Sequence, residues 1–149
     1  MAAQDLEIGE LLANYLAGAA QVTTYVADRI RPDALDVKDR LPAIRYETIT
    51  ATPWHNLQGA AGKGEARVQF DCYGRTRREA NQVGKAVRDV LDGLARVTLS
   101  DSVTVYDCVA DVTYDRREPP GDGGQQWRCK RVIDFIVTHS EATPSLVRK

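Results

Sequence analysis

The stretch EARVQFDCYGRTRREANQVGKAVRDVLDGL, residues 65–94, contains the two strongest local patterns of this chain. In its first part apolar residues occupy every second position. This predicts a β-strand over 65–73 with one face on a core and the other facing water or a partner. The apolar face consists of Ala66, Val68, Phe70 and Cys72. The polar face consists of Arg67, Gln69, Asp71 and Tyr73.

The second part of the stretch predicts an amphipathic helix. Thr76 and Glu79 have the S/T-x-x-E spacing of a capping box, in which each side chain accepts a hydrogen bond from the other residue's free backbone N–H. Apolar residues then recur at helical spacing, and Gly93 stands where a C-terminal cap is expected. The apolar stripe consists of Ala80, Val83, Val87, Val90, Leu91 and Leu94.

Upstream of this stretch the pattern predicts two helical segments. Apolar residues from Ile8 to Leu16 follow helical spacing, and Asp5 is the expected N-cap of that helix. A second, short helical turn is expected to end at Ala27, with Tyr25 and Val26 pointing inward.

Extended structure is expected in four further places. Residues 29–31 form a short extended piece, and 43–50 alternate as a strand. Beyond the central helix one strand is expected over 97–114, interrupted near Ser100, and another over 126–139.

Proline and glycine mark the segments between these elements. Pro53 and three glycines predict a long, mobile loop over 52–65, and 118–124 predict an open turn. Residues 140–149 are expected to form a loose C-terminal tail.

This order of elements predicts one α+β domain over residues 1–139. We expect an antiparallel or mixed β-sheet of four to five strands, packed on one side by two main helices. A chain of 149 residues buries about 68–70% of its unfolded surface, so its core needs no disulfides. Its three cysteines are therefore expected to be reduced and to pack as small hydrophobic groups.

The charge balance and hydropathy exclude several classes of protein. Lysine and arginine number 20 against 21 aspartates and glutamates, whereas proteins that grip nucleic-acid backbones are usually strongly basic. No stretch has the roughly 20 apolar residues of a membrane span, and the first ten positions lack the features of a signal peptide.

One glycine-rich segment invites comparison with a phosphate-binding loop. In residues 59–64, GAAGKG, the spacing fails because Leu57 stands where the first glycine is required and Gly64 follows Lys63 in place of Ser or Thr. The segment also leads into a strand, so no helix N-terminus would hold the phosphate.

Other residues with catalytic or metal-binding chemistry form no motif. His55 and His139 have no ligand spacing to each other or to the cysteines. Asp107 and Asp111 fall on one strand face, where solvated carboxylates are far commoner than catalytic pairs. The sequence therefore predicts no enzymatic activity, no metal and no cofactor.

Two groups of residues are candidates for contacts with a partner. Trp54 and His55 lie in the segment expected to be a loop, and tryptophan is enriched at binding hot spots. A cluster of cations, which opposes the helix dipole, stands before and in the first turn of the central helix. This cluster is either a solvated helix end or a docking patch for an acidic partner or DNA phosphates; it consists of Arg75, Arg77 and Arg78.

Several of these segments together resemble the tail terminator, or tail completion, proteins of long-tailed phages and gene transfer agents. The resemblance runs over roughly residues 6–139, nearly the whole chain. It is carried by DRI at 28–30, LPAIRY at 41–46, ARVQFDCY at 66–73, EA at 79–80, AVR at 86–88, LDG at 91–93 and DFIV at 134–137.

The resemblance implies a structural virion protein at the head-proximal end of the tail tube, assembled in the cytoplasm of a bacterial host. Such a protein caps the tube, ends its polymerisation, and joins the tail to the head-neck connector protein. The implied assembly is a ring, usually a hexamer of this chain, that contacts the tail tube protein and lets DNA pass through its lumen without specific binding. The polar strand face and the Trp54 segment are the expected contact surfaces. Alternatives are another head-tail connector protein or, with less support, a small nucleic-acid-binding module.

Overall fold

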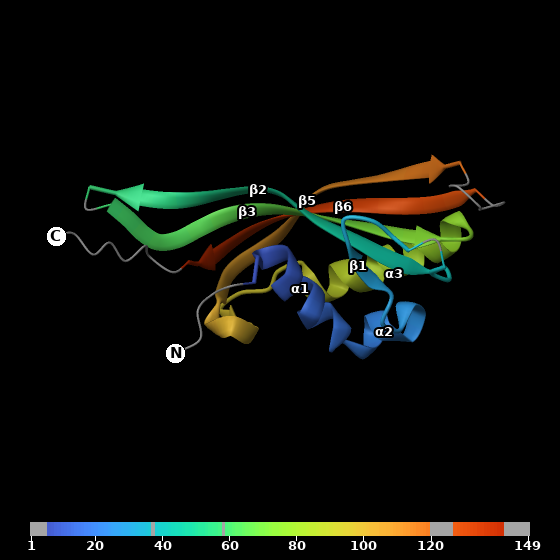
Figure 1. Ribbon diagram of the computed structural model, residues 1–149, viewed down its shortest axis with the longest axis horizontal. Helices are drawn as coiled ribbons and strands as arrows, with labels where there is room; N and C mark the ends of the chain where they lie inside the picture. The colour runs from blue at the N-terminus through green and yellow to red at the C-terminus, as the bar shows by residue number, and fades with distance from the viewer. Residues whose placement is uncertain (1–5, 37, 58, 120–126, 142–149) are drawn as a thin grey trace.

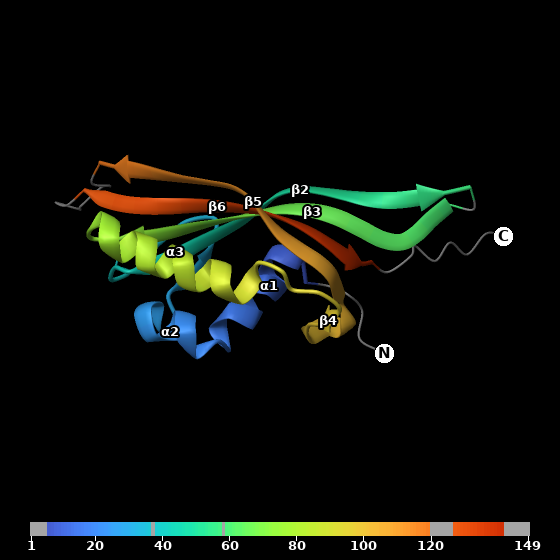
Figure 2. The ribbon, with the colours of Figure 1, turned by 180° about the vertical axis from the view of Figure 1, so that it is seen from behind.

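The computed structural model describes residues 6–36, 38–57, 59–119 and 127–141. Three α-helices lie on one face of a six-stranded sheet (Figures 1 and 2). The helices are α1 (Ile8–Ala17), α2 (Ala20–Val26) and α3 (Arg77–Leu91). The strands are β1 (Ile30–Pro32), β2 (Ala43–Asn56), β3 (Gly59–Gly74), β4 (Val97–Thr98), β5 (Thr104–Glu118) and β6 (Arg128–Ser140).

The strand order is β1-β2-β3-β6-β5-β4, with β1 parallel to β2 and all other neighbours antiparallel. The expected α+β class and mixed sheet are confirmed, but four to five strands is too few. A short 3₁₀ helix at Ser100–Ser102 divides the segment expected as one interrupted strand into β4 and β5. The two expected main helices are α1 and α3, and α2 joins them on the same face.

The N-terminal helices follow the predicted pattern with one error. Val26 is fully buried, whereas Tyr25, expected to point inward, is exposed on α2. The N-cap of α1 is Glu7, whose side chain makes no capping bond, and Asp5 lies outside the described residues. Packing of the apolar face therefore holds α1 in place without a side-chain cap.

The central helix α3 begins at the predicted cap. Thr76 Oγ1 accepts a hydrogen bond from the Glu79 backbone N–H at 3.1 Å. The Glu79 carboxylate accepts from the backbone N–H of Arg75, at 2.9 Å, one residue earlier than a capping box requires. Gly93 has a φ of +87°, as expected of a glycine after a helix, and its N–H donates to Cys108 O at 2.7 Å. These bonds fix both ends of α3 against its neighbours.

The core lies between the helices and one face of the sheet. The apolar face predicted for β3 is fully buried there, and the rings of Phe70 and Phe135 pack edge to face with centroids 5.8 Å apart. Cys72 and Cys108 are buried in this core and Cys129 is half-buried; all three are free. The helices contribute Leu11, Leu12, Leu16, Val22, Val26, Val83, Val87 and Leu91.

The expectation of a mobile loop over 52–65 is wrong. β2 continues to Asn56 and β3 begins at Gly59, so most of this segment is a paired β-hairpin. Pro53 is tolerated because β2 is the outer strand at this point, where no neighbour needs its missing N–H. Gly62, with a φ of +76°, lies where the β2–β3 register shifts between Pro53 and His55.

The sheet extends beyond the helices at one end. In Figure 1 the β2–β3 hairpin projects past the helical layer, whereas α3 lies beside the opposite end, where β5 ends and β6 begins. Of the remaining expectations, 120–126 of the open turn and 142–149 of the C-terminal tail lie outside the described residues, and β6 reaches Ser140.

Candidate assembly interface

The end of the β2–β3 hairpin, residues 49–63, is here named the arm. It carries the two candidate contact residues from the predicted loop: Trp54, 39% exposed, and His55, also exposed. Trp54 falls at the register shift between Pro53 and His55, where regular pairing is interrupted. Ile49 lies at a second shift and is 42% exposed. The arm therefore presents large apolar side chains to the outside.

Few neighbours support the arm within the subunit. Pairing of β3 with β6 ends at Lys63 and Ser140, followed by one bond from the Glu141 N–H to Gly62 O at 2.9 Å, and β1 pairs with β2 no further than Tyr46. Among the described residues, the outer edge of β2 along the arm is thus unpaired. An open edge of this kind invites pairing with another chain.

The four polar-face candidates of β3 lie on the sheet face opposite the helices, but they are not equally accessible. Arg67 and Gln69 are half-buried at the surface. Asp71 is fully buried and Tyr73 nearly so, and for these two the expectation of a face toward water or a partner is wrong. Only Arg67 and Gln69 remain directly available for contacts.

Asp71 is the centre of a charged network that joins three strands. Arg45 of β2 donates to Asp71 Oδ2 from Nε at 3.1 Å and forms an ion pair through Nη2 at 3.0 Å. Lys130 of β6 reaches the same oxygen at 3.2 Å. Gln69 donates to Oδ1 at 2.9 Å. Both carboxylate oxygens are therefore satisfied, as a buried charge requires.

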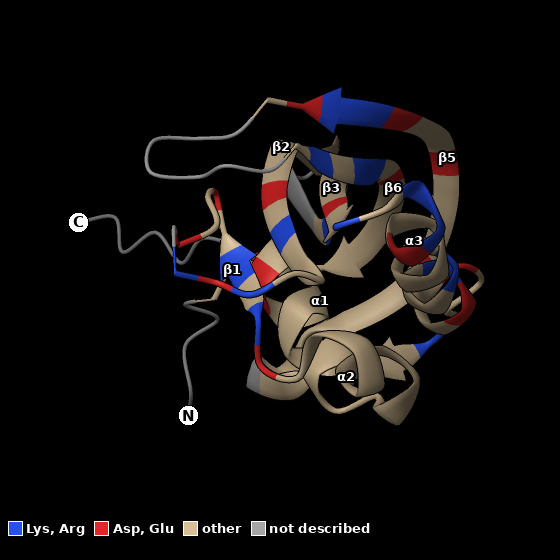
Figure 3. Cartoon of the chain, turned by 90° about the vertical axis from the view of Figure 1, so that its right-hand side faces the viewer, with Lys and Arg blue, Asp and Glu red and all other residues tan. Residues whose placement is uncertain are grey.

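Lys130 extends this network to the end of β5. Its Nζ lies 2.7 Å from Glu118 Oε1, while Arg128 reaches Oε2 at 3.1 Å and the Tyr73 hydroxyl donates to Oε1 at 3.3 Å. Burial acts to raise the pKa of Glu118, but the bonds from Lys130, Arg128 and Tyr73 outweigh it and hold the pKa below its usual value. Figure 3 shows residues of both charges on the strands at this end of the sheet, where β5 ends. The network therefore connects β2, β3, β5 and β6 within the subunit.

Arg67 takes part in a second group of charges, nearer the arm. Its Nη1 lies 2.8 Å from Asp111 Oδ2 and 3.4 Å from Asp134 Oδ2, which links β3 to β5 and β6. Burial raises the pKa of Asp134 despite the neighbouring Arg67. The carboxylate of Asp111, which the sequence placed on one strand face with Asp107, is thus paired with Arg67.

The three arginines at the start of α3 differ in their surroundings. Arg75 is tied to Glu79, with Nη2 3.0 Å from Oε2. Arg77 reaches Asp115 Oδ2 at 3.3 Å and has a largely exposed side chain. Arg78 is exposed and has no acidic partner among the described residues. Of the three, Arg78 is thus the cation without an ion pair among the described residues, and Arg77 is the more exposed of the two paired arginines.

The described part of the chain contains no assembled catalytic or metal site. Within it, no three His, Cys, Asp or Glu side chains gather to hold a metal. His139 is buried, lies beside Ser140 O at 2.8 Å, and borders a small cavity that neither Asp107 nor Asp111 lines. Burial raises the pKa of the Cys108 thiol to about 12 and that of Cys72 well above its usual range, which makes both poor nucleophiles. None of the helices resolved here is both long and apolar enough to cross a membrane.

Sequence reasoning missed one exposed surface on β5. Val109 and Val112 are 45% and 44% exposed, and Tyr114 is exposed beside them. These residues lie on the face of the sheet without helices. The irregular alternation of 104–118 was the available signal, but two register shifts between β5 and β6 obscure which residues share a face. Exposed apolar residues of this kind mark a contact surface when they gather.

Comparison with known proteins adds a family and a related structure. Residues 10–132 match the family model described as "Tail completion protein gp17". Among solved structures, a chain from the virion of a native gene transfer agent particle superposes with a TM-score of 0.65 at 15% sequence identity, covering 87% of this chain and 91% of that chain. At this identity the likeness establishes the fold. A comparison with curated proteins gave no match.

Proposed function

The chain belongs to the tail completion protein gp17 family and is thus a structural protein of a phage-type tail; from this premise we propose that it caps the head-proximal end of the tail tube. In this role it ends polymerisation of the tube and joins the tail to the head-neck connector protein. The observation that carries the proposal furthest is the arm, a projecting hairpin with exposed apolar side chains and little support of its own. No enzymatic step is part of this role.

The arm fits an assembly role on physical grounds. A hairpin with an unpaired outer edge gains main-chain hydrogen bonds and buries Trp54 and Ile49 when it docks on another chain. Before docking, the same residues contribute little to the subunit's own stability. The arm is therefore suited to become buried at the moment of joining.

A closed ring, in our proposal a hexamer of this chain, requires two different surfaces on each subunit. The sheet offers two such surfaces: the outer edge of β2 along the arm, and the exposed apolar side chains of β5 around Val109 and Val112. In this arrangement DNA passes through the lumen without specific contacts. The nearly balanced charge of the chain supports a lumen that does not grip phosphates.

Electron microscopy of particles assembled without this protein tests the proposed function. If it caps the tube, tails are longer than normal and are not attached to heads, and supplying the wild-type chain restores both length and joining. Tails of normal length that join heads in the absence of the protein would contradict the proposal. Normal length with failed joining would assign the chain to the neck and remove the capping role.

A further inference from the structure

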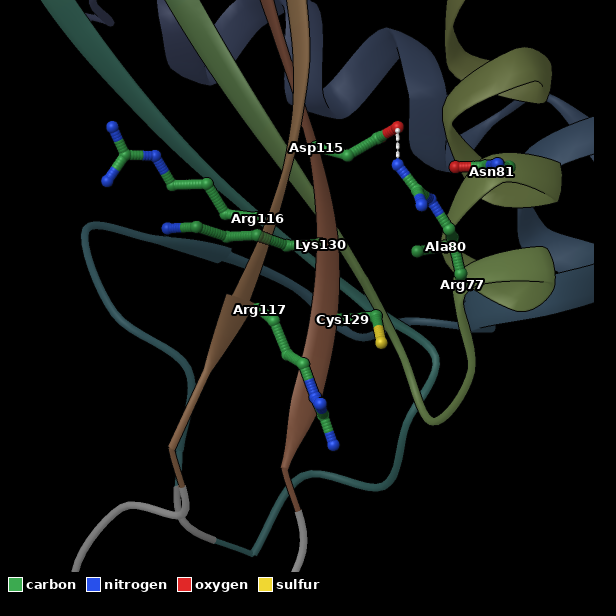
Figure 4. Close-up of a pocket in the computed structure, with 8 residues that line it drawn as sticks. All are labelled: Arg77, Ala80, Asn81, Asp115, Arg116, Arg117, Cys129 and Lys130. Atoms are coloured by element: carbon green, nitrogen blue, oxygen red, sulfur yellow. Dashed lines mark hydrogen bonds and ion pairs between the residues drawn. The ribbon is translucent and has the colours of Figure 1, made fainter.

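A cavity of about 360 Å³ lies between the first turns of α3 and the ends of β5 and β6. Figure 4 shows how its walls are built: Arg77, Ala80 and Asn81 come from α3, and Asp115, Arg117 and Cys129 come from the two strands. The side chains of Arg116 and Lys130 extend from the other side of the strands in this view. The cavity is therefore faced by two guanidinium groups, one carboxylate and a small apolar floor.

The one carboxylate in this cavity is already shared. Arg131 binds Asp115 through two hydrogen bonds, Nε to Oδ1 at 2.9 Å and Nη2 to Oδ2 at 3.2 Å. Arg77 makes a longer contact with Oδ2, at 3.3 Å. The hydrogen bonds from Arg131, with those from Arg77, hold the pKa of Asp115 below its usual value. One negative charge thus faces two cations, and Arg77 is the more weakly held.

Arg117 has no acidic partner in the part of the chain that the structure describes. Its guanidinium lies over the ring of Trp127, with Cζ 4.9 Å from the ring centroid. Stacking orients a guanidinium while leaving its N–H groups free to donate to an oxygen acceptor. Arg117 is therefore a pre-positioned, uncompensated cation at the mouth of the cavity.

A second, shallower hollow of about 540 Å³ adjoins the first and shares Arg77 and Asn81 with it. Its lining contains no acidic residue; it consists of Arg77, Arg78, Asn81, Gln82, Lys85 and Arg131. Of these cations Arg78 forms no ion pair with a residue that the structure describes, and Lys85 is paired with Asp89 at 2.7 Å. The two hollows lie side by side along α3 and are together named the cationic channel.

We propose that the cationic channel binds a carboxylate-rich peptide segment of a partner protein. Arg77 and Arg117 receive acidic side chains of that segment. Arginine suits this task because its planar fork matches a carboxylate. The inference rests on the channel itself and does not depend on which particle component supplies the segment.

The distribution of charge disfavours nucleic acid as the occupant. Carboxylates interrupt the surrounding basic surface, with Asp115 inside the cavity and Asp89 beside the shallower hollow. Proteins that follow a nucleic-acid backbone present a more continuous run of cations.

Fluorescence anisotropy with the purified full chain tests this proposal. The probe is a fluorescein-labelled hexaglutamate peptide at low salt, compared with a labelled thymidine oligonucleotide of equal charge. We expect the peptide to bind more tightly than the oligonucleotide. The double variant Arg77→Gln/Arg117→Gln should weaken peptide binding at least about tenfold, because it removes two charge-assisted contacts.

A further double variant separates this site from general electrostatics. Lys38→Gln/Arg40→Gln removes the same charge from the exposed connection before β2 and should change peptide binding less than about twofold. The proposal would be overturned if the peptide does not bind or if the oligonucleotide binds more tightly than the peptide. It would also be overturned if the Arg77/Arg117 double variant binds the peptide as tightly as the wild type does. Melting temperatures of all variants confirm that they are folded.

Discussion

The two ends of the sheet differ in how they are held. At one end the arm, residues 49–63, contains a single charged residue, Lys63, whose Nζ lies over the ring of Tyr106. At the other end the last residues of β5 and the first residues of β6 include seven charged residues, and the described side chains among them form ion pairs within the subunit or stack on aromatic rings. These residues are Asp115, Arg116, Arg117, Glu118, Arg128, Lys130 and Arg131.

The difference separates two tasks within one sheet. At the charged end the carboxylates of Asp71 and Glu118 form ion pairs with cations from neighbouring strands. These ion pairs fix the relative positions of β2, β3, β5 and β6. Among the described residues the arm forms no ion pair, and it exposes Trp54 and Ile49. We expect substitutions at the charged end to lower stability and substitutions on the arm to impair assembly.

The largest effect is expected from Asp71→Ala. Removing this carboxylate leaves Arg45 and Lys130 partly buried without their shared partner, which lowers the free energy of unfolding by about 3–5 kcal/mol. Chemical denaturation at neutral pH measures this loss in the free energy of unfolding. Glu47→Ala is the matched control, because Glu47 contacts the same Arg45 at 3.3 Å from a more exposed position and should cost less than about 1 kcal/mol. Equal losses for both variants would show that the network does not hold the sheet.

A smaller effect, dependent on pH, is expected from Glu118→Gln. The pKa of Glu118 in the folded protein lies below the ordinary value of 4.5, so the ionised carboxylate stabilises the fold above that value. This contribution is lost as the pH falls through the folded pKa. At neutral pH the variant should be less stable than the wild type by about 1 kcal/mol.

The melting temperatures of the two proteins should therefore converge as the medium is acidified below pH 4.5. A gap that is the same at neutral and acidic pH would mean that the Glu118 charge contributes nothing. The wild type should lose stability more steeply than the variant over this range.

The sequence predicted those parts of the fold that depend on local patterns. The capped helix α3 and the inward face of β3 were correct because each is encoded within about twenty consecutive residues, where spacing alone distinguishes a helix from a strand. The interruption at Ser100–Ser102 was also visible, although not that it separates two strands.

Long-range pairing accounts for what the sequence did not predict. Pro53 and the glycines of 59–64 read locally as a loop, but pairing of β2 with β3 carries them into a hairpin. Asp71 reads as a solvent-facing residue of an alternating strand, yet Arg45 and Lys130, from strands 26 and 59 residues away, enclose it. The channel beside α3 has the same origin, since its cations come from a helix and two strands far apart in the chain.

The smallest effect on stability, and the most direct test of the account, is expected from Trp54→Ala on the arm. Trp54 is partly exposed at a point where the regular pairing of β2 with β3 is interrupted. Its loss should therefore change the free energy of unfolding by no more than about 0.5 kcal/mol. Tyr25→Ala, an exposed aromatic residue of α2 on the helical side, is the control and should behave as wild type in assembly.

The deciding measurement is the fraction of tails joined to heads, counted by electron microscopy, in particles that carry Trp54→Ala. The account predicts that this fraction falls well below the wild-type value, while the melting temperature of the purified variant is unchanged and Tyr25→Ala particles are joined normally. Trp54→Ala particles with tails of normal length that join heads as often as wild type would contradict the assembly role of the arm.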